Sequence, residues 1–253
     1  MKLFSVCGIR LTGKTTTIEN IIKELKKRRY SVGSVKEIHY EDFAIDKKGT
    51  NTYRHSQAGA EPVTARGYNE TDILYKERLS LQKILRNYSQ DYVILEGVEK
   101  GNFPKIITAK EREEIDERLD DMVFAISGKI ADEIDEYKGI PVINCINETE
   151  KLVDLIEEKV FEKLPDFPAD CCTACGFNCR ELGKKILRGE AKRSDCVISD
   201  TNTKLYINGN EIDMVPFVQR LLYNAVEGVV SELDGYQEGF SIKVKIGNDK
   251  TCK

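Results

Sequence analysis

The sequence of 253 residues has no long apolar run, no internal repeat and no excess of positive charge. A membrane-spanning helix needs about 20 apolar residues in succession, so we expect no membrane partner. The formal net charge of −4 provides no basic stripe of the kind that binds phosphate backbones, so we expect no nucleic-acid partner either. Residues 1–6 run directly into a glycine-containing motif instead of a cleavable signal pattern, which predicts a cytoplasmic protein.

That motif is GIRLTGKT at residues 8–15, and it fits the phosphate-binding loop pattern G-x-x-x-x-G-K-[ST]. An apolar run at residues 3–7 predicts a strand before it, and apolar residues at helical spacing from 18 to 25 predict a helix after it. Backbone amides of such a loop and the start of the helix favour a bound phosphate. The residues expected to form the phosphate cradle are Gly8, Ile9, Arg10, Leu11, Thr12, Gly13, Lys14, Thr15 and Thr16.

Three residues carry the expected chemistry of this loop. Lys14 would neutralise the β and γ phosphates, and the Thr15 hydroxyl would coordinate Mg²⁺. Glu96 follows the apolar run at residues 92–95, so it lies at the carboxyl end of a predicted strand, where a carboxylate holds Mg²⁺ in phosphate-loop proteins. We therefore predict Lys14 and Glu96 as catalytic residues and Thr15 and Glu96 as magnesium ligands; the alternative for Glu96 is an acid that caps a helix.

Strands and helices alternate along the first 164 residues. Further strands are predicted at residues 31–37, 122–126 and 141–145, with helices near residues 79–85 and 150–162. This alternation is typical of the α/β class and predicts a P-loop NTPase fold with a doubly wound, mostly parallel sheet. Residues 39–70 are polar and lack periodicity, which predicts a long loop that is either functional or disordered.

Two prolines, Pro165 and Pro168, indicate a boundary between domain 1–164 and a second, smaller domain at 165–253. In the second domain, residues 204–212 carry an Asn-Gly hairpin signal, residues 217–230 carry a helical apolar stripe, and residues 240–246 alternate as a strand. This part is predicted to be a small, cysteine-rich α+β unit.

Four cysteines of the second domain have the spacing of metal ligands: Cys172, Cys175, Cys179 and Cys196. Three lie close together and one is remote, an arrangement that favours a 4Fe-4S cluster over zinc, which more often uses two short cysteine pairs. Zinc remains the alternative metal. The spacing does not distinguish Cys171 from Cys172 as the first ligand.

Beyond the phosphate loop, the first 160 or so residues carry a further set of motif residues: Val35, Lys36, His39, Asp46, residues 48–51, Arg54, residues 58–60, Glu96, Gly97, Pro104 and Lys105. With these residues this part of the chain resembles the MobB family, the molybdopterin-guanine dinucleotide biosynthesis adapter proteins. The chain departs from the family pattern at Thr12, where serine is usual, at Tyr40, where a second histidine is usual, and at Asn51, where an acid is common.

The resemblance implies a GTP-binding accessory protein that uses Mg²⁺, hydrolyses GTP slowly and assists attachment of the nucleotide to a molybdenum or tungsten cofactor. It implies as partners the molybdenum cofactor nucleotidyltransferase, molybdo- and tungsto-enzymes, and a second copy of the chain. His39 and Arg54 would contact a phosphate-bearing ligand or partner, or would be ordinary loop charges. Slow hydrolysis is also expected because no arginine finger or water-positioning residue is identifiable.

The cysteine region is similar to the small Fe-S motif of corrinoid iron-sulfur proteins and Rnf-type electron carriers. The pattern C-x-x-C-G-[YF] matches residues 172–177, and a Gly-Glu pair follows at residues 189–190. This second resemblance supports an alternative function, in which the chain is an ATP-driven Fe-S redox or metal-delivery protein of the nitrogenase-like class.

Overall fold

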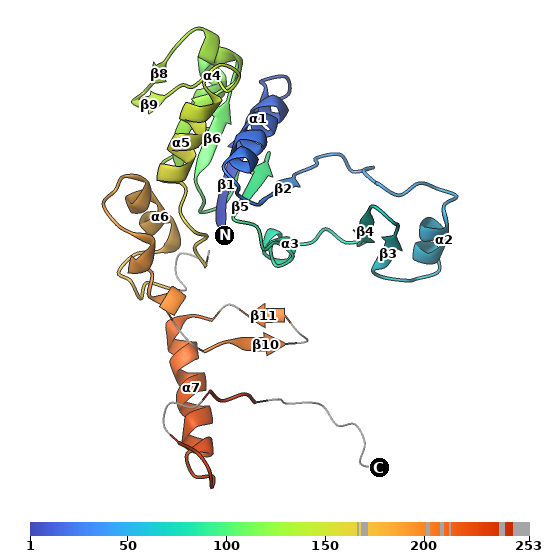
Figure 1. Ribbon diagram of the computed structural model, residues 1–253, viewed down its shortest axis with the longest axis vertical. Coiled ribbons are helices and arrows are strands. Elements are labelled where there is room, and N and C mark those ends of the chain that lie inside the picture. The colour runs from blue at the N-terminus through green and yellow to red at the C-terminus, as the bar shows by residue number, and fades with distance from the viewer. Residues whose placement is uncertain are drawn as a thin grey trace. The chain divides into compact units, whose positions relative to one another are not determined.

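The computed structural model describes residues 1–165, 167, 172–200, 203–207, 210–212, 214–237 and 241–244 (Figure 1). The chain divides into two compact units, one of residues 1–166 and 179–193 and the other of residues 167–178 and 194–253. Helix α6 (Cys179–Leu187) thus belongs to the first unit, although it follows the proline pair. The domain division at residue 164 stays a prediction.

The first unit is built on a parallel sheet with the strand order β2-β5-β1-β6-β7. Four of its five strands were predicted, and the α/β class with a parallel sheet is confirmed. β1, β5, β6 and β7 are buried almost throughout, as expected of a parallel sheet that is covered on both faces. The strands are β1 (Lys2–Cys7), β2 (Val32–Lys36), β5 (Tyr92–Glu96), β6 (Lys105–Thr108) and β7 (Val123–Ser127).

Strand β6 was not predicted, although it lies next to β1. Two apolar residues between a lysine and a threonine give too short a run to detect. Lys105 is nevertheless buried, because its ammonium lies 2.6 Å from the Asp120 carboxylate. The predicted strand at 141–145 is mostly absent: Val142 makes an isolated parallel bridge to Ile126, while β9 (Ile140–Pro141) pairs with β8 (Glu136–Tyr137) in a separate antiparallel pair.

Helices connect the strands, and three of them confirm predicted segments: α1, α3 and α5. α1 and α5 pack against each other, and Arg28, the C-cap residue of α1, forms ion pairs with Asp154 and Glu157 of α5 at 2.6 and 2.5 Å. No described helix is both long enough and apolar enough to cross a membrane. The helical elements of the sheet region are α1 (Lys14–Lys27), α3 (Leu81–Leu85), α4 (Arg112–Asp116), the 3-10 helix η1 (Lys129–Asp132) and α5 (Thr149–Lys159).

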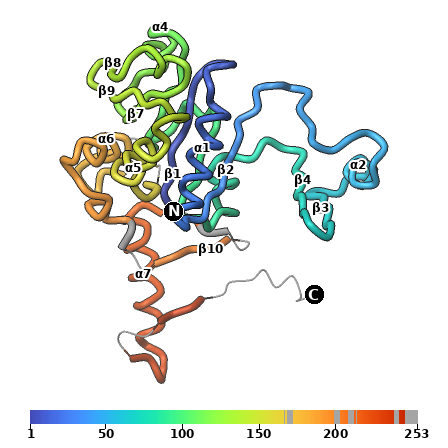
Figure 2. The backbone as a smooth tube through the Cα atoms, turned by 45° about the horizontal axis from the view of Figure 1, so that its top comes forward, coloured from blue at the N-terminus to red at the C-terminus, as the bar shows by residue number. Residues whose placement is uncertain are grey.

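The structure has ordered elements within residues 37–80, a segment that includes the long loop predicted at residues 39–70. They form α2 (Asn51–Gln57) and a two-stranded antiparallel hairpin of β3 (Val63–Arg66) and β4 (Thr71–Leu74), drawn in blue and green-blue in Figure 2. We call this segment the arm. α2 has no buried residue, and the hairpin strands bury little. Hydrophobic periodicity records burial, so it cannot detect such exposed elements.

Helix α6 packs on the sheet unit through charge and close contact. Arg180 lies 2.8 Å from the Asp121 carboxylate, and Lys184 lies 3.0 Å from the same carboxylate. A Cβ atom at Gly183 would lie 3.1 Å from the Met122 side chain, so the helix approaches the unit closely at this point. These contacts explain why α6 groups with the first unit.

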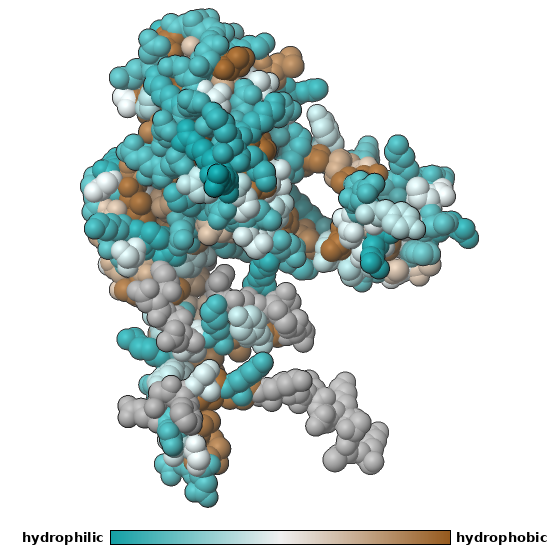
Figure 3. Space-filling view, viewed as in Figure 1, coloured by the Kyte–Doolittle hydropathy of each residue, from teal (hydrophilic) through white to brown (hydrophobic). Residues whose placement is uncertain are grey.

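The second unit contains the 3-10 helix η3 (Val197–Asp200), a hairpin of β10 (Leu205–Ile207) and β11 (Asn210–Ile212), and helix α7 (Pro216–Val230). The predicted hairpin and helix are confirmed, with the turn residues 208–209 outside the described residues. Residues 241–244 of the predicted last strand form no strand, and the rest of that strand lies outside the described residues. Apolar side chains are exposed along α7 (Figure 3), among them Phe217, Leu221, Tyr223 and Val229.

Candidate functional site

The loop at residues 8–13 joins the carboxyl end of β1 to the start of α1, where the sequence analysis places it. Gly13 occupies the N-cap position of α1 in a left-handed conformation, with no side-chain cap. The first turn of the helix carries no acidic residue. The helix therefore presents its amides and the positive end of its dipole without a competing side chain, which favours an anion at this position.

Two buried threonine hydroxyls connect the loop to the sheet by hydrogen bonds. The Thr12 hydroxyl lies 3.0 Å from the Ile9 carbonyl and 2.8 Å from the Thr108 hydroxyl at the end of β6, and either oxygen can accept its one proton. Thr108 in turn donates to the Cys7 carbonyl at 3.1 Å. Thr12 and Thr108 are both fully buried. These bonds fix the loop to two neighbouring strands, so its backbone conformation is set before any ligand arrives.

Two glycines allow the backbone to pack this tightly. A Cβ atom at Gly8 would lie 2.2 Å from the Thr108 carbonyl oxygen. A Cβ atom at Gly128, directly after β7, would lie 2.3 Å from the Thr12 carbonyl oxygen, which also accepts a hydrogen bond from the Lys129 amide at 3.3 Å. Any side chain at either position would displace the loop.

Lys14 points back over the loop. Its ammonium donates to the Gly8 carbonyl at 2.7 Å and also to the Ile9 carbonyl. Burial lowers the pKa of Lys14, the Glu96 carboxylate acts against this shift, and Lys36 adds to it. The charges of Glu96 and Lys36 therefore both act on the Lys14 ammonium.

Glu96 ends β5, which pairs with β1 on one side and β2 on the other. Its carboxylate accepts a hydrogen bond from the Thr15 hydroxyl at 3.5 Å and forms an ion pair with Lys36. The structure thus brings together Thr15 and Glu96, the two predicted magnesium ligands. A hydroxyl and a carboxylate are the hard oxygen donors that Mg²⁺ prefers, and a cationic group already lies against the acid, so this pair fits the ion.

Other predicted residues lie on the arm. His39 and Arg54 are exposed, and their role as ligand contacts stays a prediction. Asp46 organises the arm instead, because its carboxylate accepts hydrogen bonds from the hydroxyls of Thr50 at 2.7 Å and Thr52 at 3.0 Å. The bond from Thr50 lowers the pKa of Asp46. Thr50 itself caps α2.

The four candidate cluster cysteines are distributed over both units. Cys172, Cys175 and Cys196 belong to the second unit, whereas Cys179 is the first residue of α6. Cys179 and Cys196 are buried, Cys172 and Cys175 are half-buried, and Cys171 lies outside the described residues. Among the residues that the structure describes, no three His, Cys, Asp or Glu side chains are grouped so as to hold a metal ion. The cluster therefore stays a prediction.

Sequence reasoning missed the residues that support the loop from neighbouring strands. Thr108 belongs to the undetected strand β6, and Gly128 follows β7 without any motif around it. The only available signal was position, because both residues come at the carboxyl ends of strands, where ligands bind in open parallel sheets.

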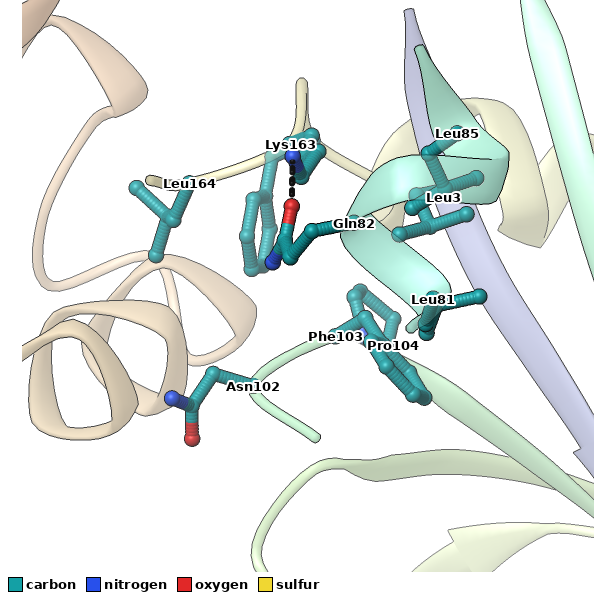
Figure 4. A pocket seen from close by; sticks show the side chains of 10 residues that line it. Leu3, Leu81, Gln82, Leu85, Asn102, Phe103, Pro104, Lys163 and Leu164 are labelled. Carbon is teal, nitrogen blue, oxygen red and sulfur yellow. Dashed lines mark hydrogen bonds between the residues drawn. The ribbon is translucent and has the colours of Figure 1, made fainter. Parts of the chain in front are cut away.

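A small apolar pocket lies at the opposite edge of the sheet, near the amino ends of β1 and β6 (Figure 4). Leu3, Leu85 and Phe103 line it, and Lys163 donates to Gln82 at 2.5 Å across its mouth. Its cavity volume of about 10 Å³ is that of a single water molecule at most. It is therefore no site for a nucleotide or another small molecule.

Comparison with known proteins identifies a family and several similar proteins. The family model described as molybdopterin guanine dinucleotide synthesis protein B matches residues 3–128. A Methanocaldococcus jannaschii protein, described as a molybdopterin-guanine dinucleotide biosynthesis adapter, is 30% identical over 99% of this chain and 99% of its own length. A Bacillus subtilis protein of the same description is 24% identical over 56% of this chain and 85% of its length.

Solved structures agree with the fold of the first unit. The crystal structure of Bacillus subtilis MobB covers 64% of this chain and 100% of its own, with a TM-score of 0.54 and 22% identity. At that identity the likeness shows the fold alone. The Methanocaldococcus jannaschii protein matches beyond this region and includes the cysteine-rich part of the chain.

Proposed function

Because the chain belongs to the molybdopterin-guanine dinucleotide biosynthesis adapter family, we propose that it binds GTP with Mg²⁺ and assists attachment of a guanine nucleotide to the molybdenum or tungsten cofactor. The observation that carries this proposal is the braced phosphate loop, which lies beside the pair Thr15 and Glu96 at the carboxyl edge of the sheet.

Each side chain of the site has a defined part in binding. The amides of residues 8–16 hold the phosphates, and the Lys14 ammonium leaves its carbonyl partners to neutralise the β and γ phosphates. Thr15 and Glu96, which already lie within hydrogen-bonding distance of each other, would hold the metal ion. Bound Mg²⁺ supplies positive charge to the phosphate oxygens. Lys14 and Glu96 are thus the proposed catalytic residues of a slow GTPase.

We expect the nucleotide to act as a switch for a partner. Its slow hydrolysis follows from the lack of an identifiable arginine finger in the sequence, and such a group raises rates by about 10³ to 10⁵. The proposed partners are the molybdenum cofactor nucleotidyltransferase, molybdo- or tungsto-enzymes, and a second copy of the chain. Family membership favours this function over the ATP-driven redox alternative.

Residues 165–253, predicted as the second domain, are proposed to bind a 4Fe-4S cluster through Cys172, Cys175, Cys179 and Cys196, with zinc as the alternative. Its support is the ligand spacing. A cluster there would give the adapter a second, redox- or metal-dependent input that MobB-like proteins limited to the first unit lack.

Calorimetric titration with GTP and with ATP in the presence of Mg²⁺ tests the nucleotide proposal. We expect GTP to bind and Lys14→Ala to weaken binding by at least about tenfold, since a charge-assisted contact to phosphate is lost. Lys26→Ala, which removes an exposed lysine from the far end of α1, is the matched control and should bind like the wild type. Binding of ATP without GTP would overturn the assignment, and normal binding by Lys14→Ala would overturn the phosphate cradle.

A further inference from the structure

A second lysine belongs to the nucleotide site by position. Lys36 is the last residue of β2 and pairs in register with Glu96, the last residue of β5, while Glu96 pairs in turn with Val6 of β1. Two steps across the sheet therefore separate Lys36 from the strand that leads into the phosphate loop. Adjacent strands are about 4.8 Å apart, so the backbone of Lys36 lies roughly 10 Å from that of β1. A lysine side chain spans most of this distance.

The ammonium of Lys36 is already directed into the site. It forms an ion pair with the same Glu96 oxygen, Oε1, that accepts the Thr15 hydroxyl. The Glu96 side chain is only 14% exposed, whereas that of Lys36 is 58% exposed. The acid is thus mostly enclosed by the site, whereas the lysine is mostly exposed to solvent.

An ion pair with so exposed a lysine contributes little to stability, so stability gives no reason for this contact. The position of the contact indicates a role in the site instead, because the Lys36 ammonium lies against the Glu96 carboxylate that is proposed to hold Mg²⁺. Two cations cannot share one carboxylate oxygen without strong repulsion. A metal ion at this oxygen of Glu96 would compete with Lys36 for it, and a displaced Lys36 ammonium would be available to a phosphate bound at the loop.

We propose that Lys36 is a nucleotide-state sensor: it substitutes for the metal ion at Glu96 before Mg²⁺ binds, and it contacts the γ phosphate of GTP once the metal takes its place. This inference rests on the proposed function and goes beyond it, because it assigns the discrimination between GTP and GDP to a residue outside the phosphate loop.

Two measurements on Lys36→Gln test the proposal. The first is the ratio of the dissociation constants for GDP and GTP at saturating Mg²⁺, which should fall by roughly tenfold because only GTP loses a charge-assisted contact. The second is the Mg²⁺ concentration that half-saturates the protein–GDP complex, which should fall several-fold because a competing cation has been removed. Lys36→Arg keeps the charge and should retain most of the GTP preference.

Lys26→Gln makes the same charge change at an exposed position on α1 and should alter neither quantity. Thermal unfolding of each variant establishes that it is folded. If Lys36→Gln keeps the wild-type ratio and the wild-type Mg²⁺ dependence, the sensor role is wrong while the proposed function stands, provided that wild-type GTP binding depends on Lys14. If the wild type does not bind GTP, both proposals fail.

Discussion

Substitution of Gly128 by alanine is the sharpest test of how the phosphate loop is supported. Gly128 has φ +89° and ψ −157°, a conformation that is essentially restricted to glycine. Its α-carbon faces the Thr12 carbonyl, and an added Cβ would lie 2.3 Å from that oxygen and 3.0 Å from the backbone of Ala109. Neither neighbour is a flexible side chain, so the loop itself must shift.

The expected cost has two parts. Holding a non-glycine residue in this backbone region costs about 1–3 kcal/mol. Overpacking against a rigid neighbour costs about 1–3 kcal/mol more. We therefore expect Gly128→Ala to lower the free energy of unfolding by about 2–6 kcal/mol, a large part of the stability of about 5–15 kcal/mol that is usual for a domain.

Urea denaturation measures this change, and Gly139→Ala is the matched control. Gly139 also has a positive φ, of +78°, but a Cβ atom there would meet no atom within 4 Å. Its substitution should cost only the backbone strain, about 1–2 kcal/mol. Nucleotide affinity should fall at least tenfold in Gly128→Ala and stay unchanged in Gly139→Ala. Equal stability of the two variants would refute the close approach between β7 and the loop.

Two further predictions concern the ion pair between Lys105 and Asp120 and the candidate cluster cysteines. Burial raises the pKa of Asp120, but hydrogen bonds from Lys105 and the Met122 amide outweigh this effect and hold the pKa below its usual value. The ion pair of Lys105 and Asp120 therefore stabilises the fold above about pH 4, and this contribution is lost as the pH falls through the folded-state pKa of Asp120. Asp120→Asn should lower the free energy of unfolding by about 2–3 kcal/mol in urea denaturation at neutral pH. If this variant loses stability between neutral and acidic pH to the same extent as the wild type, the assignment is wrong. Anaerobically purified protein should contain iron and sulfide with visible absorption; Cys175→Ser should lose them and Cys7→Ser should not, whereas a colourless protein with one zinc would contradict the cluster.

The sequence predicted the part of the site that depends on a contiguous motif. The loop at residues 8–15 and Glu96 could be identified because each lies directly beside an apolar run, and the structure places them together at one edge of the sheet. Lys36 could be located at a strand end but not paired with Glu96, since strand order is not encoded in the spacing of residues along the chain.

What could not be predicted depends on neighbours distant in sequence. Lys105 is polar and yet buried, because Asp120 neutralises it, so β6 has no apolar pattern of its own. Thr108 and Gly128 support the loop only through the strand order β1-β6-β7. The ordered elements within the loop predicted at residues 39–70 could not be recognised, because they are held by local bonds, such as those to Asp46, and bury almost nothing.

Reconstituted transfer of the guanine nucleotide tests the central claim most directly. The assay measures formation of the guanine dinucleotide cofactor from molybdopterin cofactor and GTP by the nucleotidyltransferase, with and without this protein. The account predicts that the wild-type protein increases product formation and that Lys14→Ala does not, while Lys26→Ala acts like the wild type. Equal product formation with and without the wild-type protein, or equal stimulation by Lys14→Ala, would contradict it.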